Sequence, residues 1–168
     1  AILRIDVDTV SANLNYGIPV DNPFVSDTLE FSDEIYAYGL RNPWKISIDS
    51  KSRMFIGDCG EATIESVYLL NDLNPTVPYN LGWPFYEGSQ LMIKQLPLPA
   101  NITDPIFEYS HNGGKGVIGG YFLEELNLYI VADYLGHIRQ SYLRRMMETI
   151  GGASRFVLVA RAPSRIID

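Results

Sequence analysis

The sequence is poor in cysteine and histidine, with only Cys59, His111 and His137 among 168 residues. A single cysteine cannot form an internal disulfide, and these few residues offer no zinc-type spacing. We therefore expect Cys59 to be a small buried side chain rather than a nucleophile. His137 has no Asp and Ser pattern nearby, which argues against a Ser-His-Asp triad. His111 lies in a predicted loop and is expected at the surface.

Blocks of basic residues and long apolar runs are also missing. The net charge is −7, and an acidic chain without a basic block is a poor partner for nucleic acid or an anionic membrane. No apolar run reaches the ~18 residues of a membrane span. The sequence starts without Met and without a leader-type segment, so we expect an internal piece of a longer protein.

Short segments rich in Ile, Val, Tyr and Phe recur instead, most of them bounded by Gly, Pro, Asn, Asp or Ser. This pattern predicts β-strands. The expected strands are 3–7, 34–40, 45–49, 53–58, 66–70, 105–109, 117–123, 127–134, 137–143 and 155–160. We also expect a tight hairpin turn at 49–52 and one short helix at 141–149.

The spacing of these strands favours an all-β fold, either a sandwich, a barrel or a propeller. The four strands expected within 34–70 fit one propeller blade, and 118–143 fits most of another. A closed ring usually takes about four to eight blades, more than a chain of this length holds. We therefore expect an arc of a β-propeller, with the glycines of 116–120 where backbones approach closely.

Six motifs occur in an order that is more specific than any of them alone. They are YGIPVDNPF (16–24), EIYAYGLRNPWKISID (34–49), FIGDCGEATIESVYLL (55–70), YNLGWPFYEG (79–88), DPIFEYSHNGGKGVIGGYF (104–122) and YIVADYLGHI (129–138). Together they resemble the glucose/sorbosone dehydrogenase domain, most clearly over 3–143. That family contains bacterial soluble quinoprotein sugar dehydrogenases and the animal hedgehog-interacting protein with its relatives. The resemblance implies a six-bladed β-propeller, with 1–168 a partial domain and roughly the C-terminal half.

The resemblance also implies a quinone site. In the dehydrogenases of this family, pyrroloquinoline quinone (PQQ) lies over a calcium ion at the mouth of the propeller channel. Arg41 and Asn42 match the quinone-contacting Arg-Asn, and an arginine fork suits the carboxylates of PQQ. The alternative is that Arg41 pairs with a carboxylate between blades while Trp44 packs in the core.

A calcium site is implied by the segment 57–65. The resemblance assigns the backbone carbonyls of Gly60 and Glu61 and the carboxylate of Glu65 as ligands. Oxygen donors of these kinds are the ones that calcium prefers. The alternative is an ordinary loop between strands, with Glu65 in solvent.

Several positions depart from the pattern of the dehydrogenases. Trp44 replaces a cofactor-contacting glutamine, Ser66 replaces an acid, and Leu81 replaces a tyrosine. Tyr134 falls near the position of a cofactor-facing lysine. The family's catalytic histidine belongs to an earlier blade, so no catalytic residue is expected in this chain.

Two functions follow from the resemblance. The intact parent protein oxidises a sugar or another polyol with PQQ and calcium, or it is a secreted, non-catalytic scaffold that binds an extracellular protein ligand, as the hedgehog-interacting-protein branch does. The tripeptide 101–103 is an N-glycosylation sequon. It predicts a glycan on Asn101 and an extracellular location.

Overall fold

The structure, a computed structural model, describes residues 1–11, 13–25, 31–75, 77–94, 97–142 and 157–161. Over these residues the chain is all-β apart from one short 3-10 helix, η1 (Glu124–Leu126). No helix in these ranges is long and apolar enough to cross a membrane. The all-β expectation is confirmed.

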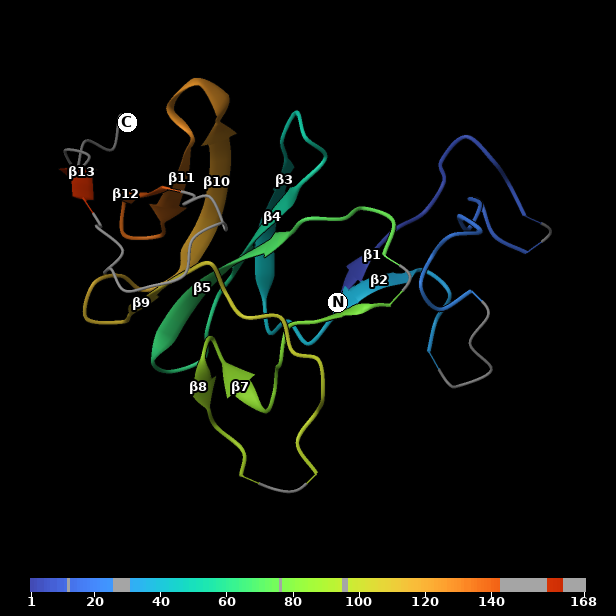
Figure 1. Ribbon diagram of the computed structural model, residues 1–168, viewed down its shortest axis with the longest axis horizontal. Coiled ribbons are helices and arrows are strands. Elements are labelled where there is room, and N and C mark those ends of the chain that lie inside the picture. The colour runs from blue at the N-terminus through green and yellow to red at the C-terminus, as the bar shows by residue number, and fades with distance from the viewer. Residues whose placement is uncertain (12, 26–30, 76, 95–96, 143–156, 162–168) are drawn as a thin grey trace, which may run out of the picture.

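Two four-stranded antiparallel sheets form the body of the molecule (Figure 1). The central sheet has the order β3 (Pro43–Ile48), β4 (Met54–Asp58), β5 (Ile64–Leu70) and β9 (Phe107–Ser110). The C-terminal sheet has the order β10 (Val117–Leu123), β11 (Leu128–Asp133), β12 (His137–Tyr142) and β13 (Val157–Arg161). A smaller N-terminal sheet contains β1 (Ile2–Leu3), β2 (Ile35–Tyr38) and β6 (Tyr79–Asn80), and β7 (Tyr86–Glu87) pairs with β8 (Gln90–Leu91).

Within the central sheet, β4 is buried on both faces, which explains its apolar run. Side chains of a strand alternate between faces, so Met54 and Ile56 pack toward the N-terminal sheet while Phe55 packs toward the C-terminal sheet. The ring of Phe55 stacks on Tyr129, with 4.6 Å between the centroids. Each fully buried side chain of this size contributes ~1.5–3 kcal/mol to stability.

The backbones of the central and C-terminal sheets touch where two glycines face each other. A Cβ placed on Gly57 would lie 2.8 Å from the Cα of Gly119. Only glycine fits such an approach, as expected for the glycines of 116–120. This contact holds β10 against β3 and β4.

The positions of the expected strands along the chain agree with the structure. All ten overlap an observed strand, although 3–7 shares only Leu3 with β1. The hairpin turn at 49–52 is confirmed, because the Ser52 N–H donates to the Asp49 carbonyl at 3.1 Å. Of the helix expected at 141–149, the first two residues belong to β12 and 143–149 lie outside the described residues.

The expected grouping of four strands within 34–70 into one blade is wrong. β2 pairs with β1 and β6, and the fourth strand of the central sheet is β9. The chain leaves β2 at Gly39, which has a φ of +74°, and the turn that follows starts a new sheet at β3. The other expected blade is confirmed, since 118–143 contributes β10, β11 and β12 to one sheet.

Candidate functional site

Most of the candidate residues gather at one edge of the two four-stranded sheets. Antiparallel pairing brings the starts of β3, β5 and β10 beside the ends of β4, β9 and β11. We call this edge the strand-end edge. It comprises 41–43, 58–65, 109–117 and 133–137.

The Arg41–Asn42 turn is fixed through its backbone. The Asp58 carboxylate accepts the N–H groups of Arg41 at 3.1 Å and Asn42 at 2.7 Å. Burial raises the pKa of Asp58 to about 6, although these two N–H donors act in the opposite direction. The Cys59 N–H donates to the Asn42 carbonyl at 3.1 Å, so the turn is also tied to the end of β4.

None of these hydrogen bonds uses the Arg41 side chain. Its guanidinium lies over the ring of Trp83, 5.7 Å from the centroid, and no carboxylate of a described residue pairs with it. Trp44 is 64% exposed. The alternative in which Trp44 packs in the core is therefore wrong. The ion pair that this alternative expected between Arg41 and a carboxylate is not found within the described ranges. An exposed, oriented guanidinium on a fixed turn fits the carboxylates of a ligand such as PQQ.

The loop 60–64 closes around a carboxylate from a distant hairpin. Glu87 is 2% exposed, and its Oε1 accepts the N–H groups of Glu61, Ala62, Thr63 and Ile64 at 2.7, 2.8, 2.9 and 3.2 Å. Burial opposes ionisation, but these hydrogen bonds outweigh it and lower the pKa of Glu87 to about 2. The N–H groups of this loop thus form an anion-binding nest, and the anion that occupies it is the Glu87 carboxylate.

Glu65 is buried and fully engaged. It is 1% exposed, its Oε1 lies 2.6 Å from His111 Nε2, and its Oε2 accepts the Val117 N–H at 2.8 Å. The alternative of a solvated Glu65 is therefore wrong. Glu61, the other acid of the segment, is exposed.

Calcium fits this segment only in part. Within the described ranges, no group of three or more His, Cys, Asp or Glu side chains is placed to hold a metal ion. Each oxygen of Glu65 already makes a polar contact, and the side chain is only 1% exposed, so neither oxygen faces solvent where an ion could approach. The backbone carbonyls of Gly60 and Glu61 stay a prediction, because a carbonyl ligand needs no such cluster.

Cys59 and His111 both make polar contacts within the strand-end edge. The Cys59 thiol donates to the Val117 carbonyl at 3.1 Å, and burial raises its pKa to about 12. The predicted burial of this cysteine is confirmed. His111 differs from the expectation. Its side chain is only 19% exposed because it faces Glu65.

A second buried carboxylate, Asp133, was missed by the sequence analysis. It accepts the Tyr109 hydroxyl at 2.6 Å and the Gly116 N–H at 3.2 Å. Burial opposes ionisation of Asp133, but these donors keep its pKa below the usual value. The signal was present, since an Asp at a strand end three residues before Gly136 is typical of a turn that uses the carboxylate as acceptor.

The four positions that depart from the dehydrogenase pattern separate into two groups. Trp44 and Tyr134 are 64% and 75% exposed, so their rings are accessible from solvent. Ser66 and Leu81 are 2% and 1% exposed and belong to the interior of the sheets. Only the first pair is therefore in a position to alter ligand binding.

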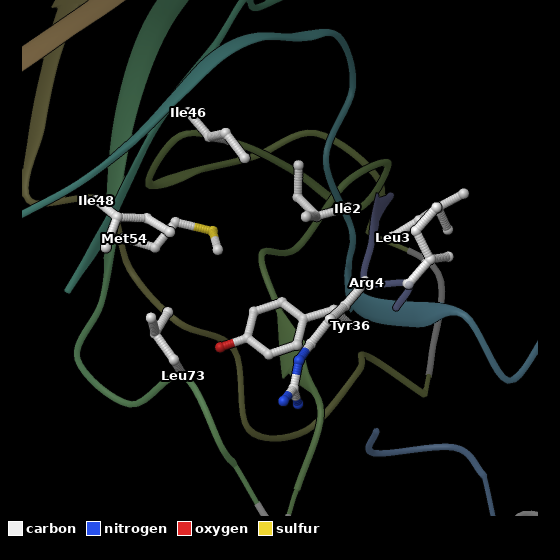
Figure 2. Close-up of a pocket in the computed structure, with 9 residues that line it drawn as sticks. Ile2, Leu3, Arg4, Tyr36, Ile46, Ile48, Met54 and Leu73 are labelled. Carbon is white, nitrogen blue, oxygen red and sulfur yellow. The ribbon is translucent and has the colours of Figure 1, made fainter. Parts of the chain in front are cut away.

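An apolar groove of about 330 Å³ lies on the other side of β3 (Figure 2). Ile46, Ile48 and the neighbouring Met54 line one side of it, and Tyr36 and Arg4 lie on the other. Such walls suit burial of apolar surface rather than a reaction.

The sequence profile of the family "Glucose / Sorbosone dehydrogenase" matches residues 8–143. The HIPL2 protein of Arabidopsis thaliana is 35% identical over 144 residues, which cover 72% of this chain and 20% of that protein. The HIPL1 protein of the same plant is 34% identical over 166 residues, covering 81% and 23%. The hedgehog-interacting protein of Homo sapiens is 39% identical over 49 residues, covering 29% and 7%. The chain thus spans about a fifth of the length of the HIPL proteins.

A solved structure shares the fold. The PQQ-bound aldose sugar dehydrogenase of Streptomyces coelicolor superposes with a TM-score of 0.52 at 20% identity, over 81% of this chain and 35% of that one. Together with the profile match, which covers most of the sequence, these similarities identify the family. The chain belongs to the glucose/sorbosone dehydrogenase family.

Proposed function

We propose that this chain is part of a longer β-propeller protein that oxidises a sugar or another polyol with PQQ, and that Arg41 and Asn42 bind the quinone. The observation that carries the proposal is the exposed guanidinium of Arg41, which lies 5.7 Å from the centroid of the Trp83 ring and has no carboxylate partner in the described ranges. A side chain that is already oriented in this way loses little further conformational freedom when an anion binds.

The residues of the edge have distinct tasks in this proposal. Arg41 pairs with a carboxylate of the quinone, Asn42 donates a further hydrogen bond, and Asp58 holds the turn that carries both. Bound PQQ would accept two electrons and a proton equivalent from the substrate, as a hydride. A calcium ion would be held by the carbonyls of Gly60 and Glu61 together with oxygens of the quinone.

Replacing Arg41 by glutamine is expected to weaken PQQ binding to the full-length protein about 10- to 100-fold, because a charge-assisted contact is lost. A titration that follows the quinone absorbance, with calcium present, measures the dissociation constant. Lys51→Gln is the matched control. It removes the same charge from the turn between β3 and β4, at the far end of the sheet, and should leave the constant unchanged.

Equal binding by the wild type and Arg41→Gln would contradict the quinone assignment. Binding followed by reduction of an artificial dye on addition of aldose would establish the dehydrogenase. If a folded protein shows no binding at micromolar PQQ in this titration, the second function remains. In that function the propeller is a secreted scaffold for an extracellular protein ligand, which the similarity to the HIPL and hedgehog-interacting proteins favours.

We also propose that the protein is secreted and glycosylated at Asn101. Asn101 is exposed in the connection between β8 and β9, so an oligosaccharyltransferase can reach it. After expression in a eukaryotic secretory host, peptide N-glycosidase F should increase the gel mobility of the wild type but not of Asn101→Gln. Asn112→Gln, an exposed asparagine outside any sequon, should behave as the wild type. An Asn101→Gln protein that still responds to the enzyme would contradict the site.

A further inference from the structure

We propose that Glu65 joins the central and C-terminal sheets as a hydrogen-bond acceptor, and that it is not a ligand of a cation. Glu65 lies at the start of β5, between the end of β9 and the start of β10. It is the acid that the sequence suggests as a calcium ligand, so the structure reassigns its role.

Both oxygens of Glu65 already make polar contacts within the protein. Oε1 is 2.6 Å from His111 Nε2, and Oε2 is 2.8 Å from the Val117 nitrogen. With Glu65 ionised, both contacts are hydrogen bonds that it accepts. Each oxygen keeps a further lone-pair site, but the carboxylate is only 1% exposed, so a hydrated cation could reach it only by displacing the groups packed around it.

The loop that precedes Glu65 directs N–H groups rather than oxygens toward its centre. A calcium loop directs oxygens at the ion. Here four successive amides of residues 61–64 direct their N–H groups at Glu87 Oε1. These N–H groups favour an anion, and the Glu87 carboxylate already fills that place, so this side of the loop offers no oxygen ligand that could act together with Glu65.

Glu65 also lies where the chain passes from the central sheet to the C-terminal sheet. Residues 111–116 cross from β9 to β10, and Glu65 holds this crossing at both ends, through His111 and Val117. The Cys59 thiol adds a hydrogen bond to the Val117 carbonyl. One buried carboxylate therefore fixes where the C-terminal sheet begins relative to the central sheet.

The role of Glu65 is tested with two variants of the full-length protein. Glu65→Gln keeps one acceptor oxygen for the Val117 N–H, and its NH2 can donate to His111 Nε2 of a neutral ring, so both contacts can be retained without the negative charge. Glu65→Leu has a similar volume but leaves His111 and Val117 without an acceptor. We expect the melting temperature to fall by about 5–10 °C in Glu65→Leu and by much less in Glu65→Gln. Amide exchange at Val117 should accelerate at least ~10-fold in Glu65→Leu.

Calcium response separates this role from metal binding. Melting temperatures are measured in EDTA and in calcium chloride, with Glu125→Gln as an exposed-acid control. Any calcium-induced increase seen in the wild type should be the same in Glu65→Gln, and no increase in either protein also agrees with the proposal. An increase that is present in the wild type and lost in Glu65→Gln would overturn it. So would a Glu65→Leu protein with the stability and amide exchange of the wild type.

Discussion

Replacing Glu87 by alanine is expected to lower the free energy of unfolding by about 3–5 kcal/mol, because four backbone N–H groups of 61–64 lose their acceptor. The Glu87→Gln protein should lose less, about 1–2 kcal/mol, since an amide oxygen still accepts these bonds without the charge. Urea unfolding of the full-length protein measures both values. Glu125→Gln, an exposed acid on η1, should change stability by no more than about 0.5 kcal/mol.

The effect of Glu87 should also depend on pH in a defined direction. Its folded-state pKa is lowered to about 2 from an ordinary value of 4.5, so folding favours the ionised form. The contribution is complete above pH 4.5 and is lost as the pH falls toward 2. The stability difference between the wild type and Glu87→Gln should therefore shrink over this interval. A difference that stays constant down to pH 3 would contradict the role of the charge.

The Gly57→Ala substitution is expected to destabilise the protein by about 3 kcal/mol or more. The added Cβ would lie 2.8 Å from the Cα and 2.9 Å from the nitrogen of Gly119, and backbone atoms cannot move aside as a side chain tip can. Relief requires that the central and C-terminal sheets separate. Thermal or urea unfolding measures the loss.

Gly136→Ala is the matched comparison for Gly57→Ala. Gly136 has a φ of +79°, but a Cβ there meets nothing within 4 Å. The cost is therefore only the backbone strain of about 1 kcal/mol. If Gly57→Ala costs no more than Gly136→Ala, the two sheets are not in the close contact described above.

The sequence could predict where strands lie but not how they pair. The strand positions depend on local patterns of β-branched and aromatic residues, which explains why all ten expected strands overlap observed ones. Strand order depends on contacts between distant segments. β9 therefore could not be assigned to the central sheet from its own residues, and two-residue strands such as β7 carry no alternation to recognise.

The candidate site shows the same division. Arg41 and Asn42 were found because they sit in a recognisable motif, and the structure leaves the Arg41 charge available. The partners of Glu65 could not be found in this way, since His111 lies 46 residues and Val117 lies 52 residues further along the chain. A motif assigns a residue type to a position, whereas only the packed structure shows which of its atoms already have hydrogen-bond partners.

The late arrival of β9 has a consequence for synthesis of the protein. β3, β4 and β5 follow one another in sequence, but the outer edge of β5 is paired only by β9, after the intervening residues 71–106. A ribosome adds about 5–20 residues per second. The edge of β5 thus stays unpaired on the nascent chain for about 2–8 s after Leu70 is made. During that interval β5 is the strand of the central sheet that a chaperone would have to shield from edge-to-edge association.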